Sequence, residues 1–259
     1  MSGIEGTAPP EMWIGTSGWV YRDWRGAVYP ERLPQRSWLE HVSRRFRTIE
    51  INASFYRLPL RSTFEAWSSQ VPTGFRFSVK MSRFLTHVRR FRDPIEPVER
   101  FWERASGLGS ALGPVLLQQP PTFVKDLGLL RDLLHTLPTG MRPAFEFRHP
   151  SWHGDDVLSL LDSAGAAWVL ADRPGVRMPA HVTGGWSYVR FHRGTRLGFP
   201  YTGEKLRRRS RTIAALDADE VFVYFNNDPG GAAVHDAERL QRLLDPDRRE
   251  ARARRGHGS

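Results

Sequence analysis

The chain of 259 residues contains no cysteine, and this absence removes several classes of site. It excludes a disulfide framework, a zinc site built on thiolates and a cysteine nucleophile. No stretch approaches the roughly 20 consecutive apolar residues that a membrane-spanning helix needs, and residues 1–11 lack the apolar core of a signal peptide. We therefore expect a soluble, cytoplasmic protein that does not enter a membrane.

Phosphate-binding glycine loops and common metal motifs are also missing. No apolar run is followed by G-x-G-x-x-G or a Walker sequence, which counts against an open, doubly wound sheet. The nine histidines show no H-x-H or H-E-x-x-H spacing. We expect no cofactor and assign no metal ligands. If a divalent ion binds nonetheless, its ligands would come from Glu50, Glu146, Asp172 and His192.

Lysine is scarce, because only three of the 38 basic residues are lysines: Lys80, Lys125 and Lys205. An excess of arginine is typical of a GC-rich coding sequence, so the formal charge of +10 leaves a nucleic-acid partner open without requiring one. An ammonium can lower its pKa and transfer a proton, whereas a guanidinium cannot. Lys80, at the end of an apolar run, therefore suggests chemistry; the alternative is a structural ion pair with Glu50 or Glu146.

Eight short apolar runs are present, separated by segments with helical periodicity. Within a run the polar side chains share one parity, as where Glu50 alternates with Ile49 and Ile51. Side chains two apart lie on the same face of a strand, and here they gather toward the C-terminal ends. This pattern predicts an α/β fold: a parallel eight-stranded (β/α) TIM-like barrel, formed as a single domain, whose strand ends line one site.

The chain length suits one such barrel of about 250 residues. We expect the barrel domain to span residues 12–244, between a disordered N-terminus (1–11) and a disordered basic tail (245–259). The expected strands are 12–15, 48–52, 75–80, 114–118, 144–148, 167–172, 187–192 and 221–225. The expected helices are 37–45, 62–69, 96–106, 124–135, 155–164, 204–215 and 232–244. Residues 173–186 show no helical period, which makes this crossover unusual for a barrel.

Several motifs, in order along the chain, resemble the YecE-like family, known as domain of unknown function 72. The resemblance covers residues 12–244. Its motifs are Trp13–Trp19 with Tyr21 and Trp24, Glu50–Asn52 with Tyr56, Lys80 with His87, Gln118 before Pro120, Glu146–His149 with Trp152, Tyr188 with Arg190 and His192, and Tyr224–Asn227. The resemblance implies a TIM-barrel-like fold, but it implies no activity.

The strand ends carry the candidate site residues. Glu146 or Glu50 could act as a general base, with Lys80 or His192 as the partner acid. Arginine side chains can bind a carboxylate or phosphate, amides suit sugar hydroxyls, and loop aromatics can stack on a ligand. These substrate-binding candidates are Asn52, Tyr56, Gln118, Arg148, Arg190, Asn226, Tyr21, Trp24 and Trp152.

This set predicts an acid–base enzyme (isomerase, lyase or hydrolase) acting on a small anionic, polyhydroxylated ligand such as a sugar phosphate or sugar acid. One alternative is a nucleic-acid-binding or endonuclease-like barrel that uses residues 83–92 and 207–211 on phosphates. Another is a non-catalytic ligand-binding barrel. Each residue also has a structural alternative: Glu146 and Arg148 could pair inside the barrel, and Trp24 and Trp152 could cover the core. The oligomeric state is left open.

Overall fold

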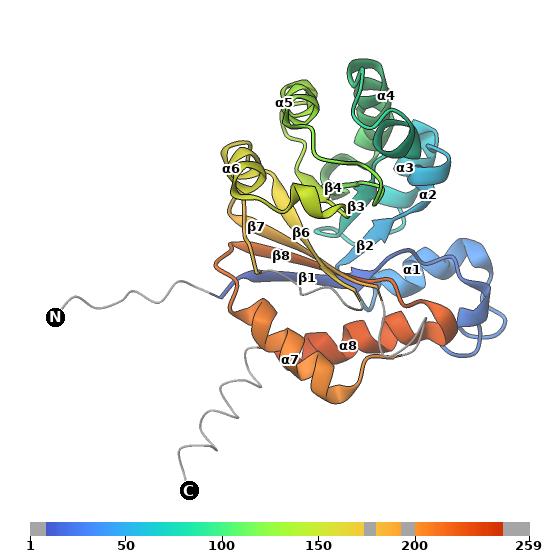
Figure 1. The fold of residues 1–259 in the computed structure, drawn as a ribbon. Helices are drawn as coiled ribbons and strands as arrows, with labels where there is room; N and C mark the ends of the chain where they lie inside the picture. Colours follow the sequence, from blue (N-terminus) through green and yellow to red (C-terminus); the bar gives the residue numbers. More distant parts are fainter. Residues whose placement is uncertain (1–8, 174–179, 193–199, 246–259) are drawn as a thin grey trace, which may run out of the picture.

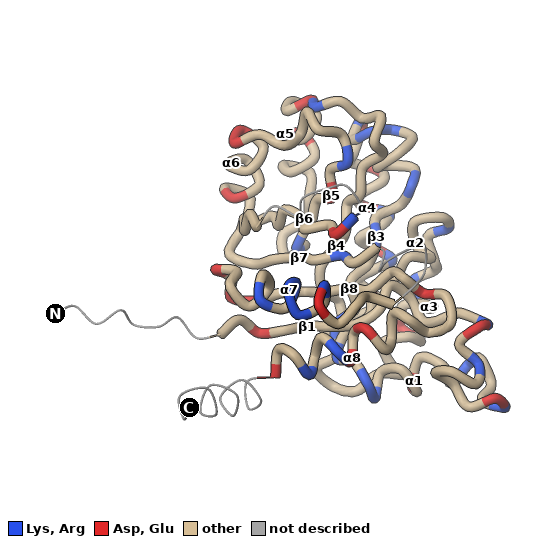
Figure 2. Tube along the Cα trace, turned by 60° about the horizontal axis from the view of Figure 1, so that its bottom comes forward, with Lys and Arg blue, Asp and Glu red and all other residues tan. Residues whose placement is uncertain are grey.

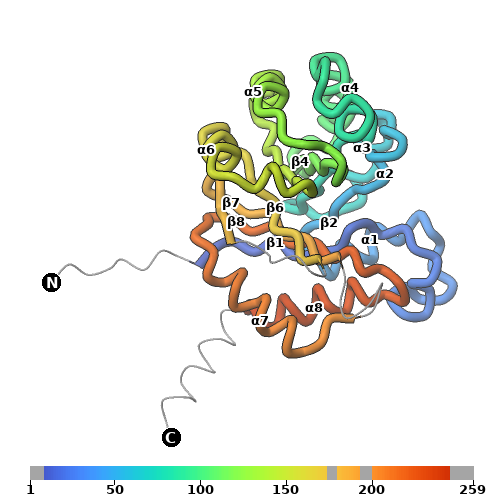
Figure 3. Tube along the Cα trace, in the orientation of Figure 1, coloured from blue at the N-terminus to red at the C-terminus, as the bar shows by residue number. Residues whose placement is uncertain are grey.

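The computed structural model describes residues 9–173, 180–192 and 200–245 (Figure 1). Eight parallel strands close into a barrel in sequence order, with the helices outside them, and this confirms the predicted fold class. The strands are β1 (Glu11–Thr16), β2 (Thr48–Ile51), β3 (Arg76–Lys80), β4 (Leu112–Gln118), β5 (Pro143–Glu146), β6 (Ala167–Asp172), β7 (Trp186–Phe191) and β8 (Glu220–Phe225). Figure 3 shows the closure, since the first strand lies beside the last.

The α-helices largely follow the predicted segments. They are α1 (Trp38–Ser43), α2 (Ala53–Tyr56), α3 (Arg61–Ser68), α4 (Ile95–Ala105), α5 (Leu127–Thr136), α6 (Asp155–Ser163), α7 (Gly203–Ala214) and α8 (Ala232–Leu244). The described part of the crossover from β6 to β7 contains no helix, as expected, and residues 174–179 lie outside the described part. No helix within the described residues is long and apolar enough to span a membrane. Of the expected disordered ends, residues 9–11 and 245 are described, and Glu11 already belongs to β1, so the prediction of disorder up to residue 11 extends too far; the rest lies outside the described residues.

Short helices were not predicted, because four or five residues do not complete a readable helical period. They include α2 and the π-helix η3 (Phe84–Val88), which follow β2 and β3 respectively. The remaining 3₁₀ turns are η1 (Arg22–Trp24), η2 (Gln35–Ser37), η4 (Ser106–Ala111), η5 (Pro150–Trp152) and η6 (Pro229–Gly231). The fifth strand also ends two residues earlier than predicted, so Arg148 lies in the loop after β5.

The barrel interior is filled by side chains in three layers. Aromatic rings form the layer at the N-terminal end, where Phe222 stacks on Trp13 at 5.6 Å and meets Trp186 edge-on at 6.0 Å. Hydroxyl groups form the middle layer, in which the Ser78 Oγ lies 2.6 Å from the Tyr188 OH. Thr48 and Tyr224 make the equivalent pair at 2.7 Å. Filled layers of this kind make the barrel a packed core rather than a pore.

Opposite parity places apolar residues between the strands and the helices. Val189 and Phe191 of β7, for example, are fully buried and belong to the main apolar core. Gly15 allows β1 to approach β2, because a Cβ at this position would lie 1.9 Å from the Thr48 carbonyl oxygen. The alternation read from the sequence therefore decides which side chains enter the barrel.

A buried carboxylate holds the loops after β7 and β8 against α8. Asp236 of α8, with no exposed surface, accepts hydrogen bonds from the Tyr201 backbone N–H at 2.8 Å and from the Asn227 Nδ2 at 2.9 Å. Arg239 Nη1 donates to the other carboxylate oxygen of Asp236 at 3.0 Å. These bonds fix the loop that follows β8, at the C-terminal end of the barrel.

Candidate active site

The third interior layer, at the C-terminal end of the barrel, is charged and centres on Arg190. This guanidinium is 1% exposed. Its Nη1 donates to Glu146 Oε2 at 2.6 Å and its Nη2 donates to Glu50 Oε1 at 2.8 Å. The Tyr188 OH donates to the other Glu50 oxygen at 2.6 Å and so joins the charged layer to the hydroxyl layer. Three predicted site residues from β2, β5 and β7 are therefore in direct contact.

A chain of hydrogen bonds brings Lys80 into the same layer. Lys80 Nζ donates to Gln118 Oε1 at 2.9 Å, and Gln118 Nε2 donates to Glu146 Oε2 at 2.9 Å. The Lys80 ammonium also lies 4.1 Å from the ring centre of Phe55. Lys80 thus contacts Glu146 through an amide rather than in a direct ion pair.

Glu146 is surrounded by basic side chains. Besides Arg190, the Arg148 Nε donates to Glu146 Oε1 at 3.0 Å, and Arg173 and His192 each lie 3.6 Å from this oxygen. The side chains of Arg148 and Arg173 are 26% and 25% exposed, whereas Glu146 is 1% exposed. The arginines therefore extend from the buried carboxylate toward solvent at the C-terminal ends of the strands, and we call this end of the barrel the mouth.

The two buried glutamates are held in the ionised state. Burial alone would raise the pKa of Glu146, but Arg190, His192 and Arg148 bring it well below its usual value. For Glu50 the burial effect is likewise outweighed, by Arg190 and the Tyr188 hydrogen bond, so its pKa is also lowered. Strong donors already occupy these carboxylates, which makes them poor proton acceptors at neutral pH.

The pKa of Lys80 moves toward neutrality instead. Burial and the nearby charge of Arg190 lower it to about 8, although Glu50 and Glu146 oppose the change. The imidazoles have lowered pKa values, chiefly through burial: that of His192 falls, and that of His87 falls to about 4. Lys80 is thus the predicted site residue best suited to exchange a proton near pH 8.

Known proteins resemble this chain in sequence and in fold. The sequence model of the family described as protein of unknown function DUF72 matches residues 13–257. The chain belongs to the DUF72 family. This confirms the resemblance seen in the motifs.

Relatives of this DUF72 chain are found both in sequence and in structure. The UPF0759 protein YunF of Bacillus subtilis is 26% identical over 272 residues, covering 90% of this chain and 95% of YunF. A DUF72 protein structure from Thermotoga maritima has a TM-score of 0.82 and 28% identity, over 91% of this chain and 99% of that one. One from Enterococcus faecalis shows the same fold, with a TM-score of 0.78, 21% identity and coverage of 90% and 95%. The SacUVDE structure shares the fold alone, with a TM-score of 0.56, 10% identity and coverage of 93% and 99%.

In this DUF72 chain the site also contains a carboxylate that the sequence analysis did not select. This residue is Asp228, in the loop after β8. It lies in the stretch Asn226–Gly230, whose composition is typical of a turn, so the local sequence offered no reason to select it. Burial and the charge of Glu50 raise the pKa of Asp228 to about 7, with the nearby Tyr21 hydroxyl opposing the change. Its Oδ1 is buried and has no hydrogen-bond partner among the described residues. Asp228 is therefore the carboxylate in this layer that can exchange a proton near neutral pH.

We expect Asp228→Asn to stabilise the protein at pH 8. The folded-state pKa of about 7 exceeds the ordinary 3.8, so at pH 8 the folded protein holds Asp228 as a buried carboxylate, and burial of this charge lowers stability. The gain, reduced for partial exposure, is of order 1–2 kcal/mol. It should shrink as the pH falls from 7 toward 4, where the native carboxyl takes up its proton. Urea unfolding across this range measures it, with the exposed Asp132→Asn as control; a gain that does not vary with pH would contradict the assignment.

The predicted amide and aromatic ligands fall into two groups: those near the mouth or the surface, and two tryptophans buried in the core. Asn52 and Asn226 follow β2 and β8 at the mouth; the Asn52 Oδ1 is buried without a partner among the described residues, and the Asn226 Nδ2 lies 3.5 Å from the His192 Nδ1. Tyr21 is half-buried, with its OH donating to the Ser17 carbonyl at 2.5 Å, and Tyr56 is 82% exposed.

The two tryptophans proposed as ligand-stacking residues lie in the core instead. Trp24 and Trp152 have no exposed surface, and each indole N–H donates to a backbone carbonyl, that of Asp228 at 2.8 Å and that of Phe123 at 2.7 Å. Trp152 also stacks on Phe147 at 4.3 Å. The structural alternative therefore holds for both, because a ligand has no access to their rings.

The four side chains proposed as metal ligands do not form one cluster, although His192 lies 3.6 Å from Glu146. Asp172 lies outside the barrel lumen and pairs with Arg209 and, at 3.1 Å, with Lys205, both on α7. Glu50 and Glu146 are separated by the guanidinium of Arg190. Within the described ranges, no three His, Asp or Glu side chains are arranged to hold a metal ion.

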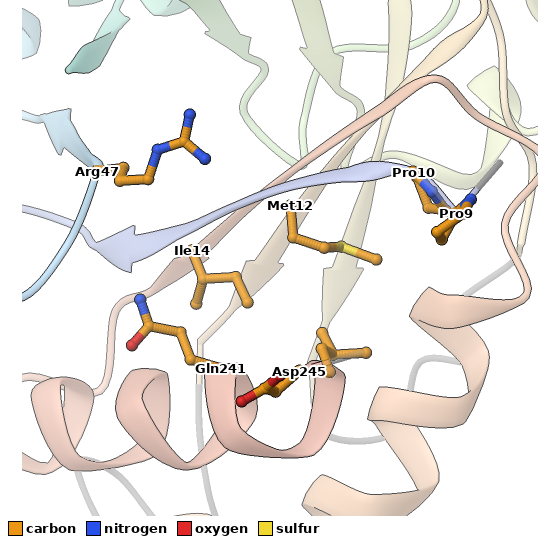
Figure 4. Close-up of a pocket in the computed structure, with 8 residues that line it drawn as sticks. Pro9, Pro10, Met12, Ile14, Arg47, Gln241 and Asp245 are labelled. Carbon is orange, nitrogen blue, oxygen red and sulfur yellow. The ribbon is translucent and has the colours of Figure 1, made fainter. Parts of the chain in front are cut away.

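A cavity at the other end of the barrel is not part of this site. It measures about 310 Å³ and lies between the start of β1 and the end of α8, lined by Met12, Ile14, Arg47, Gln241 and Leu244 among others (Figure 4). Catalytic groups of such barrels lie at the C-terminal ends of the strands, opposite this cavity.

Proposed function

We propose that this protein is an acid–base enzyme whose mouth binds a small anionic, hydroxyl-bearing substrate, such as a sugar phosphate or sugar acid. The observation that carries the proposal is the surplus of positive charge around Glu146. Arg190, Arg148 and Arg173 all lie within 3.6 Å of its oxygens. The only other carboxylate bonded to this cluster within the described residues is Glu50. An incoming anion would balance the remaining charge.

The arginines that can reach this anion are those nearest the opening. No hydrogen bond among the described residues occupies the two terminal nitrogens of Arg148, since its Nε alone holds Glu146. Paired N–H groups of this kind match the oxygens of a phosphate or carboxylate. Arg190, whose terminal nitrogens both hold glutamates, instead fixes the layer. Asn52 and Asn226 supply amides for substrate hydroxyls, whereas both ends of the Gln118 amide are held by Lys80 and Glu146.

Proton transfer is assigned to Lys80 and Asp228 in preference to the glutamates. Both have pKa values brought near neutrality, about 8 and about 7. They come from β3 and the loop after β8, three strands apart around the barrel, so a substrate held at the mouth would lie between them. An acid and a base on two sides of one substrate suit isomerisation or elimination. Glu50, Glu146 and His192 are then positioning residues.

We expect Arg148→Met to weaken the binding of ribose 5-phosphate by about tenfold or more, because charge-assisted hydrogen bonds to the phosphate are lost. Isothermal titration calorimetry at fixed ionic strength measures the change. Arg61→Met, at an exposed pair with Glu65 on α3, is the matched control and should leave the affinity unchanged. Equal binding by the Arg148 variant, or no binding of the sugar phosphate by the native protein, would contradict the proposal.

A nucleic-acid-binding or endonuclease-like barrel is the second candidate, and one observation favours it. The basic segment 83–92 follows β3 at the mouth, where Arg83 and Arg90 contribute to the lowered pKa of His87. The other basic segment, 207–211, lies on α7, where Figure 2 shows basic positions in blue. Binding of an oligonucleotide that weakens steeply with salt, together with no response to sugar phosphates, would favour this candidate.

A further inference from the structure

A second cavity opens beside the mouth, between α2, η3 and α4. It measures about 300 Å³, and its lining includes Phe55, Tyr56, Arg83, Phe84, Val88 and Arg100. We call it the aromatic groove. Large apolar side chains are normally covered, yet Tyr56 is 82% exposed, Val88 56% and Phe84 37%. Three of the seven exposed large apolar side chains in the described part of the chain therefore gather at one cavity.

The aromatic groove and the mouth share a wall. The Phe55 ring centre lies 4.1 Å from the Lys80 ammonium and 4.9 Å from the His87 ring. Directly behind this wall, the Ser54 Oγ donates to the Lys80 carbonyl at 2.6 Å. A ligand lying in the aromatic groove can therefore extend an attached anionic group into the mouth.

The surroundings of the aromatic groove favour a flat, aromatic occupant. The Arg89 guanidinium lies 5.1 Å from the Phe84 ring centre, and Arg83 forms no ion pair with the described residues. Exposed aromatic rings beside arginines stack on nucleobases with little dependence on sequence. A cavity of about 300 Å³ is at the small end of the range for ligand pockets, which suits one base.

We propose that the substrate is a free nucleotide, with its base in the aromatic groove and its terminal phosphate at the mouth. This rests on the proposed function and names its substrate class. A single nucleotide is favoured over a strand because two of the arginines beside the aromatic groove already have carboxylate partners: Arg89 is paired with Asp93 at 2.6 Å and Arg100 with Glu96 at 3.1 Å. The arginines whose charge is less fully compensated are Arg148 and Arg173, which are half-buried beside Glu146. A terminal phosphate at the end of a ligand can reach them more easily than a diester within a strand.

The test compares adenosine 5′-monophosphate with ribose 5-phosphate by calorimetry. The native protein should bind the nucleotide at least tenfold more tightly. Tyr56→Ala should remove about tenfold of the nucleotide affinity, in line with the loss of one stacked base, and leave ribose 5-phosphate binding unchanged. Tyr56→Phe is the matched control, because it keeps the ring and should keep the affinity. Tyr56 is too exposed for either substitution to threaten folding.

Three outcomes would overturn the inference: equal affinities for the two ligands, an equal loss of both in Tyr56→Ala, or tighter binding of an oligonucleotide that lacks a terminal phosphate. Failure of the proposed function gives a different result. In that case Arg148→Met would leave both affinities unchanged while Tyr56→Ala still weakened the nucleotide, which supports the aromatic groove as a base site but not the mouth as a phosphate site. If the native protein bound neither ligand, both proposals would fall.

Discussion

Replacing Arg190 with methionine is expected to lower the free energy of unfolding by about 3–5 kcal/mol. The guanidinium bonds Glu146 at 2.6 Å and Glu50 at 2.8 Å, and all three side chains are at most 1% exposed. Without Arg190, two buried carboxylates remain with much less compensation. The pKa values of both glutamates are lowered in the native protein and would rise in the variant. The variant should therefore lose most stability at neutral and alkaline pH, where the carboxylates are charged. Urea denaturation at pH 5 and pH 8 measures both effects.

Restoring charge balance provides the control. The triple variant Arg190→Met, Glu50→Gln, Glu146→Gln should recover most of the lost stability, because it leaves neither buried carboxylate without its guanidinium partner. It also keeps the experiment informative if the single variant fails to fold. Arg61→Met on the surface removes an ion pair with Glu65 that is about half exposed, and should cost less than about 1 kcal/mol. A single-variant cost as small as this would show that the Arg190 pairs are not what holds the layer together.

Strand parity is the reason why much of the site could be predicted. Glu50, Lys80, Glu146 and Arg190 were selected because each shares the polar parity of its run, and all four lie in one interior layer. Parity does not say which partner each side chain chooses. That choice depends on the barrel's register, which places Gln118 between Lys80 and Glu146 and Arg190 between the two glutamates. The general bases expected from the sequence are therefore already engaged.

The parity of Asp172 also carried information that the sequence analysis did not use. It shares the parity of Trp168 and Leu170, which belong to the outer core, so its place against α7 was readable from the sequence. Loop residues offered no such pattern. The turn-forming neighbours of Asp228 gave no sign of its burial. Likewise, nothing in the local sequence distinguishes the buried Trp24 and Trp152 from the exposed Tyr56. Burial in loops is decided by long-range packing, which a short sequence window does not contain.

Lys80→Met is expected to reduce turnover by about 10²- to 10⁴-fold, the usual contribution of a positioned proton donor or acceptor. The loss should appear in kcat, since Arg148 would still bind the substrate. The native pH–rate profile should show an ionisation near pH 8, set by burial and Arg190, which the variant lacks. Lys125→Met, at a partly exposed pair with Asp156, is the matched control. Retention of turnover and of the pH profile by Lys80→Met would exclude Lys80 from proton transfer.

The Lys80 ionisation can also be measured without a substrate, because the chain has only three lysines. Lysine-labelled protein should give an NMR signal that titrates near pH 8 and is missing in Lys80→Met. The same pKa makes a prediction about stability. Between pH 8 and 10.5 the unfolded chain holds a proton that folded Lys80 has released, so native stability relative to Lys80→Met should rise with pH, by up to about 3 kcal/mol. A flat difference across this range would mean that Lys80 is as readily protonated in the folded barrel as in water.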